Sequence, residues 1–110
     1  MTALLIANLE KVLASGKDSA LLRFGLGNAY AQAGEAAAAI AHLRRAVEFD
    51  PHYSAAWKLL GNTLAAAGDR QGALAAYRCG VVAAQHKGDK QTLREMQVFI
   101  RRLANPDRPA

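Results

Sequence analysis

The chain repeats itself with a period of 34 residues, the distance in sequence from Ala20 to Ser54. The segments 20–53 and 54–87 align without a gap and carry the same residues at many positions. A repeat of this length is usually one pair of helices that cannot bury its apolar side alone, so repeats must stack to form a core. The sequence therefore predicts a stacked helical array. The matched pairs include Gly27 with Gly61, Asn28 with Asn62, Gly34 with Gly68, Ala39 with Ala73 and Arg44 with Arg78.

Composition favours one all-α domain. Hydrophobic residues make up 52% of the 110 residues, but aromatic residues only 6%. Alanine supplies much of this difference, and it is the best helix former. No segment alternates apolar and polar residues over a length typical of a strand. A chain of this length has room for a single domain with a continuous core.

Glycine, proline and capping residues divide the chain into about six helices. A glycine is predicted to follow the last turn of four of them, because glycine adopts the left-handed conformation without strain. Asp or Ser residues are predicted to accept hydrogen bonds from the first turns. The predicted helices are 2–15, a helix capped by Asp18 or Ser19 that ends near 33, then 35–49, 54–67, 69–86 and 89–104.

The offset also extends to both ends of the array. Residues 2–15 match the second helix of a repeat, whereas 89–104 stand where the first helix of a third repeat would lie. This last segment has Arg94 and Glu95 where the repeats have Leu-Gly, as expected of an atypical terminal unit. The predicted single domain, 1–104, comprises a half repeat at 2–15, repeats at 20–53 and 54–87 and a capping helix at 89–104, followed by a flexible tail at 105–110.

These residues resemble the tetratricopeptide repeat (TPR) family, whose pattern contains Trp, Leu-Gly, Tyr, a small residue, an aromatic, another small residue and Pro. The second repeat matches with Trp57, Leu60-Gly61, Ala73, Tyr77 and Gly80. The first matches with Leu26-Gly27, Tyr30, Ala39, Ala46 and Pro51. The departures are Arg23 for the tryptophan, Leu43 and Leu64 for aromatics and Gln85 for the proline. The resemblance implies a right-handed superhelical stack of antiparallel helix pairs.

Small and aromatic residues are expected to set the spacing of the helices. Gly27 and Gly61, with Ala39 and Ala73, stand where two helices must approach closely. The three larger aromatic residues of the pattern are expected to fill the wider gaps between pairs. They are Tyr30, Trp57 and Tyr77.

By the same resemblance, the first helix of each pair lines a concave groove that binds a peptide. Asn28 and Asn62 occupy the same slot in consecutive repeats, and their amides could donate to and accept from a peptide backbone. Lys58, one turn before Asn62, is similar to the start of a carboxylate clamp in chaperone-binding TPR domains. That clamp is incomplete, because Leu93 stands where the next asparagine is expected. The predicted groove residues are Leu21, Phe24, Asn28, Gln32, Ala55, Lys58, Asn62 and Ala66, which fall within each helix at i, i+3, i+7 and i+11.

The last predicted helix is amphipathic. Its apolar face is expected to cover the end of the stack, although Phe99 and Ile100 could instead reach into the groove. Its basic edge of Lys90, Arg94 and Arg101 is either a solvated edge or a docking strip for an acidic partner. The residues of the apolar face are Leu93, Met96, Phe99, Ile100 and Leu103.

No pattern in the sequence indicates catalysis, a metal site or a cofactor. The histidines have no metal-ligand spacing with Cys79, and we expect Cys79 to be a small buried residue. His52 and His86 lie one period apart and are expected to share a surface location. No apolar stretch is long enough to span a bilayer, and no secretory signal begins the chain.

The sequence therefore favours a cytoplasmic adaptor that binds a protein or peptide in a short concave groove. The net charge of +5 supports an alternative, a nucleic-acid-associated protein, but the aromatic residues needed for base stacking are few. A third hypothesis is a scaffold that self-associates weakly through an exposed end of the short stack. The sequence does not identify the partner.

Overall fold

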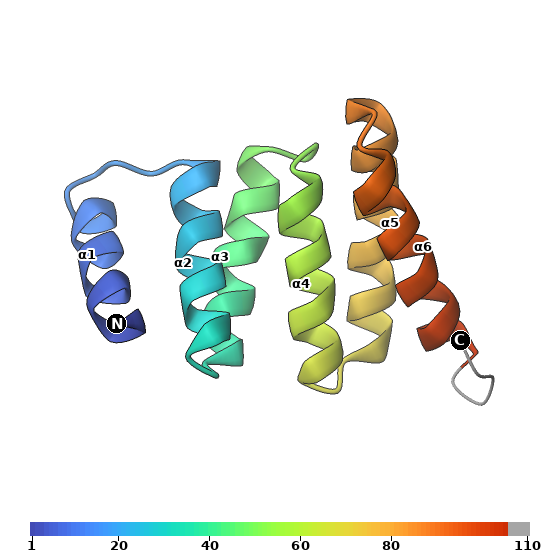
Figure 1. The fold of residues 1–110 in the computed structure, drawn as a ribbon. Coiled ribbons are helices and arrows are strands. Elements are labelled where there is room, and N and C mark those ends of the chain that lie inside the picture. Colours follow the sequence, from blue (N-terminus) through green and yellow to red (C-terminus); the bar gives the residue numbers. More distant parts are fainter. Residues whose placement is uncertain (106–110) are drawn as a thin grey trace.

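The computed structural model describes residues 1–105 and contains six α-helices over that range (Figure 1). Their ends differ from the predicted ends by at most one residue. The predicted tail lies outside the described residues, except for Asn105. None of the described helices is long and apolar enough to cross a membrane. The helices are α1 (Thr2–Ala14), α2 (Ala20–Gln32), α3 (Ala36–Phe49), α4 (Ser54–Ala66), α5 (Arg70–Lys87) and α6 (Lys90–Ala104).

Local capping explains where three of the helices begin. The side chain of Ser19, rather than that of Asp18, accepts a hydrogen bond from the first turn of α2. Asp69 and Asp89 do the same for α5 and α6, at 2.8 Å and 3.2 Å. A cap of this kind stabilises a helix by about 1 kcal/mol, because it satisfies a backbone N–H that has no partner within the helix.

The helices form a single layered stack in chain order (Figure 1). α2 pairs with α3 and α4 pairs with α5, each in antiparallel fashion, and the two pairs are joined mainly where α4 packs on α3. α1 packs on α2 at one end, and α6 packs on α5 and α4 at the other. The resulting body measures 46 × 28 × 21 Å, an all-α stack of the predicted kind.

Glycine allows the two helices of each pair to approach closely. A Cβ atom on Gly27 would lie 2.5 Å from the Leu43 side chain of α3, much closer than two carbon atoms can pack. Gly61 lies against the ring of Tyr77 in the same way. The predicted close approach is therefore confirmed. The prediction that the aromatic residues fill gaps between pairs is wrong for Tyr30, which stacks on His42 within its own pair.

The core runs along the stack and is closed by α6. Met96 has no exposed surface and packs against Gly80 of α5. Phe99 packs against Tyr77, with ring centroids 5.5 Å apart, so the apolar face of α6 covers the end of the stack as predicted. In contrast, α1 contains no buried residue.

The prediction of a buried Cys79 is wrong, because its side chain is exposed. Ala75, Arg78 and Val82 are exposed as well, and with Cys79 they form the outer side of α5 at helical spacing. The predicted shared location of His52 and His86 is confirmed. Their exposed rings stack with centroids 3.8 Å apart.

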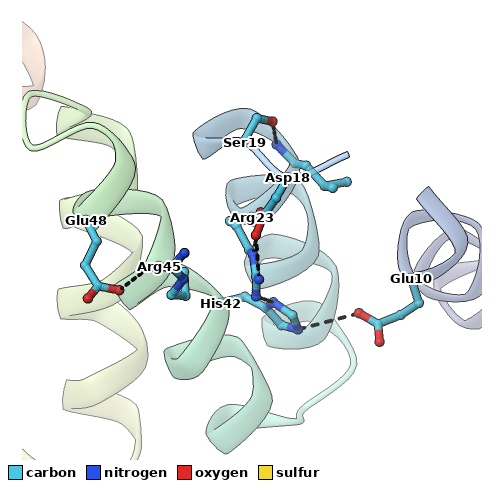
Figure 2. A network of polar contacts seen from close by, with 8 residues as sticks. Glu10, Asp18, Ser19, Arg23, His42, Arg45 and Glu48 are labelled. Carbon is cyan, nitrogen blue, oxygen red and sulfur yellow. Dashed lines mark hydrogen bonds and ion pairs between the residues drawn. The ribbon is translucent and has the colours of Figure 1, made fainter. Parts of the chain in front are cut away.

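A network of polar side chains links α1 and the following loop to the first pair (Figure 2). Arg23 of α2 stands where the second repeat has a tryptophan, and it donates two hydrogen bonds of 2.8 Å to the Asp18 carboxylate. Arg23 also lies 3.1 Å from Nδ1 of His42. On the other side of that ring, Nε2 faces the carboxylate of Glu10, 3.6 Å away. Residues of α1, the following loop, α2 and α3 are thus connected in one network, in which Arg23 contacts Asp18 and His42, and His42 contacts Glu10.

This geometry determines the protonation of His42. The Arg23 guanidinium can only donate, so Nδ1 of His42 must accept and the proton of the neutral ring lies on Nε2, towards Glu10. Burial lowers the pKa of His42, with Glu10 opposing this effect and Arg23 adding to it. The pKa of Asp18 is also lowered, mainly by its hydrogen bonds from Arg23, so its carboxylate stays ionised at mildly acidic pH.

We expect opposite effects from the same substitution at two positions of α2. Gly27→Ala should lower the free energy of unfolding by about 1–3 kcal/mol, because the new methyl group overpacks against Leu43. Gly25→Ala should raise it by about 0.5–1 kcal/mol, because the new Cβ meets only Leu9 at an ordinary 3.7 Å and alanine favours the helix. Urea unfolding followed by circular dichroism measures both. Equal effects would contradict the proposed role of Gly27.

We also expect stability to depend on pH through His42. Because its folded pKa lies below the ordinary value of about 6.5, its contribution is complete above that pH. The contribution is lost as the pH falls from there through the folded pKa. Between about pH 7.5 and 5.5, the urea midpoint of the wild type should fall further than that of His42→Gln, whose amide keeps hydrogen-bonding capacity without titrating. Both proteins retain His52 and His86, so parallel curves would rule this role out.

Candidate peptide-binding groove

A hollow of about 410 Å³ lies where the first pair of helices meets the second. Its walls come from the end of α2, the turn at Gly34, the start of α3 and one side of α4. Most of these walls are small or apolar, which leaves room between the two first helices. The lining residues are Ala31, Gly34, Ala36, Leu59, Asn62, Thr63 and Ala66.

Asn62 is the main polar group on this surface. Its side-chain oxygen accepts a hydrogen bond from the hydroxyl of Tyr77, and burial raises the pKa of Tyr77, so the phenol keeps the proton it donates. The amide nitrogen of Asn62 has no hydrogen-bond partner among residues 1–105. The hydroxyl of Thr63, in contrast, donates to the carbonyl of Leu59 at 2.7 Å. The hollow therefore presents an oriented amide donor beside apolar walls.

Two of the predicted groove residues, Asn62 and Ala66, line this hollow. The others lie outside its lining. Leu21 and Gln32 are exposed on α2, as Ala55 is on α4. Asn28 is half-buried, and Phe24 packs on the ring of Tyr53 with centroids 5.0 Å apart.

Lys58 is engaged within the chain. Its ammonium group lies 3.3 Å from the carboxylate of Glu95, so α6 supplies an acidic partner to a residue of α4. A second link joins the same two regions, because the hydroxyl of Ser54 lies 3.3 Å from the carboxylate of Asp89. A ligand that used Lys58 would have to compete with Glu95.

Some residues that line the hollow were not among the predicted groove residues. Leu59 and Thr63 flank Asn62 on α4, and together with Ala66 they follow the spacing i, i+3, i+4 and i+7. That spacing is visible in the sequence, but the family pattern directed attention to the neighbouring stripe. No sequence pattern predicted that Ala31 and Ala36 line the groove, because only the folded turn brings these two residues together.

The basic edge of α6 is exposed. Lys90, Arg94 and Arg101 all lie on its outer side, and none forms an ion pair with another described residue. Arg70 of α5 reaches the end of the same helix, where it donates to the carbonyl of Leu103 at 2.6 Å. The edge is thus separate from the hollow and lies at the far end of the stack.

Comparison with known proteins agrees with this architecture. The family model described as tetratricopeptide repeat matches the chain twice, over residues 6–61 and 31–86. A TPR repeat-containing protein of Pseudomonas aeruginosa is 55% identical over 100 residues, which cover 91% of this chain and 95% of that protein.

Two solved structures are similar in fold. The solution structure of a Bordetella parapertussis protein has a TM-score of 0.78 at 53% identity, covering 93% of this chain and 89% of that one. The crystal structure of the Sgt2 TPR domain from Aspergillus fumigatus has a TM-score of 0.72 at 24% identity, covering 96% and 72%. TPR domains generally bind protein or peptide partners and are generally not enzymes. The chain therefore belongs to the tetratricopeptide repeat family and is, in general terms, a protein–protein interaction module.

Proposed function

We propose that this chain is an adaptor that binds a short protein segment by taking one of its apolar side chains into the hollow between α2 and α4. The observation that carries the proposal is the hollow itself, about 410 Å³ of space with mostly small or apolar walls. This volume is at the low end of the range for ligand sites, and it suits one or two side chains rather than a large ligand.

The amide of Asn62 is the proposed polar contact. With its oxygen committed to Tyr77, its N–H groups are left to donate to a backbone carbonyl of the bound segment. An apolar anchor combined with such a contact gives both binding energy and direction. We favour this mode over capture of a terminal carboxylate, because Lys58 is already paired with Glu95.

The remaining predicted surfaces are proposed as secondary contacts. The groove would extend along α2 through Leu21, Phe24, Asn28 and Gln32. The basic edge of Lys90, Arg94 and Arg101 would meet acidic residues of the same partner.

We also propose that the domain is divided as predicted, into a half repeat at 2–15, repeats at 20–53 and 54–87 and a capping helix at 89–104. We further propose that the protein works in the cytoplasm, which is supported by its single, exposed cysteine.

The test is a selection of random peptides against the purified protein, followed by NMR titration of the best binder. The backbone amide shifts of the protein should change mainly around Ala31, Leu59, Asn62 and Thr63. Ala66→Arg should weaken binding at least about tenfold, because the long side chain fills the hollow and ΔΔG exceeds about 1.4 kcal/mol. Isothermal titration calorimetry gives the affinities.

The matched control is Ala75→Arg, which adds the same side chain at an exposed position on the outer side of α5. It should leave the affinity unchanged within about twofold, a difference below 0.5 kcal/mol. If Ala66→Arg weakens binding no more than Ala75→Arg does, the hollow is not the binding site. Shift changes confined to the basic edge of α6 would contradict the proposal in the same way.

A further inference from the structure

The N-terminal end of the stack has an uncovered apolar face. α1 packs on α2, has no buried residue, and leaves Leu4, Leu5 and Val12 exposed at 64%, 47% and 41% (Figure 1). A single exposed leucine is ordinary, but the terminal unit of a stacked array normally needs a polar outer face. At the other end α6 meets this requirement, because its outer side carries charged and amide groups.

The uncovered side of α1 corresponds, in the repeat alignment, to the side of α3 that packs closely on α2. The 34-residue offset places Leu5, Asn8 and Val12 on Ala39, His42 and Ala46 of α3. In α3 those residues lie against α2, as the contacts of Ala39 with Gly27 and of His42 with Tyr30 show. Among the described helices, none covers this face of α1 in the way that α2 covers α3.

The size of the Leu5 and Val12 side chains indicates a partner helix that packs less closely than α2 packs on α3. Leu5 and Val12 stand where α3 has alanines that are fully buried. A helix approaching α1 as closely as α2 approaches α3 would collide with them. They suit a partner helix at a wider separation, near the 9–10 Å upper range for packed helices, whose own large side chains interdigitate with them.

The distribution of charge favours a second copy of this chain. Residues 1–54 contain five basic and five acidic residues, so the net charge of +5 lies entirely in the remainder. Within α1, Glu10 faces His42, and Lys11 is the charged side chain left on the outer side. Two copies that met through α1 would join neutral ends and keep their basic ends far apart on bodies 46 Å long.

We propose that the face of Leu4, Leu5, Asn8 and Val12 on α1 pairs with the same face of a second copy, forming a two-fold dimer with antiparallel α1 helices. A two-fold axis near Asn8 sets the leucines of one copy against Val12 of the other. It also lets the two Asn8 amides exchange hydrogen bonds and separates the two Lys11 charges.

The size of the face predicts a weak dimer. With 13 residues, α1 is about 20 Å long and offers a strip about 10 Å wide. Each copy would therefore bury less than the roughly 800 Å² typical of a stable interface. An interface of this size is typical of weak, transient complexes. We therefore expect a dissociation constant on the order of 100 µM to 1 mM, close to the weak end of the affinity scale.

Sedimentation equilibrium between about 20 µM and 2 mM brackets that constant and tests the proposal. The average mass of the wild type should rise from 11.7 kDa towards twice that value. Leu5→Lys with Val12→Lys should remain monomeric, and Val82→Lys, which replaces another exposed apolar residue on α5, should behave as the wild type. A monomeric wild type at 2 mM would overturn the proposal, as would equal effects of the α1 and α5 variants.

A cross-linking experiment tests the orientation and does not depend on the lysine variants. In a Cys79→Ser chain, Asn8→Cys would place two thiols beside the two-fold axis. Mild oxidation with diamide should then form a disulfide-linked dimer much faster than in Gln97→Cys, whose thiol lies on the exposed side of α6. Equal cross-linking rates at the two positions would contradict the antiparallel arrangement.

Discussion

The close approach of the two helices within each pair is the constraint on which the rest of the structure depends. Gly27 and Gly61 have no side chain, so Leu43 and Tyr77 can lie directly over the backbone of the facing helix. Once each pair is this compact, its remaining apolar side chains lie on the outer sides of the pair. Only stacking against another helix can bury them. The hollow between α2 and α4 arises because the tight contacts lie inside the pairs and leave looser ones between them.

The sequence was sufficient to predict the helices, because caps and glycine stops are local signals. It was less informative where distant segments meet. Nothing near Lys58 indicates that it pairs with Glu95, 37 residues away. Leu59 and Thr63 were missed because the walls of the hollow depend on how two helices meet, whereas the family pattern gives one stripe on each. Cys79 was wrongly predicted because small apolar residues occupy both sides of α5.

The two repeats have different side chains at one equivalent position, Arg23 in the first and Trp57 in the second. The second repeat uses Trp57, whose indole donates to the carbonyl of Pro51 at 2.8 Å. The first has Arg23 at that position, and its charge is balanced by Asp18 and by a neutral His42. A charged residue at an apolar position needs such partners, because an unpaired buried charge is costly. The substitution thereby gives α1, through Glu10, a polar link to the first pair.

The stacking order has a consequence for how the chain reaches its fold. Every helix packs on helices that are close to it in sequence, so the contact order is low and few long loops must close. Such topologies fold within microseconds to milliseconds, and their central units form most readily because they gain two neighbours. The α2–α5 body is therefore expected to form first. α1, which gains one neighbour and buries least, is expected to dock last and to exchange its amide protons fastest.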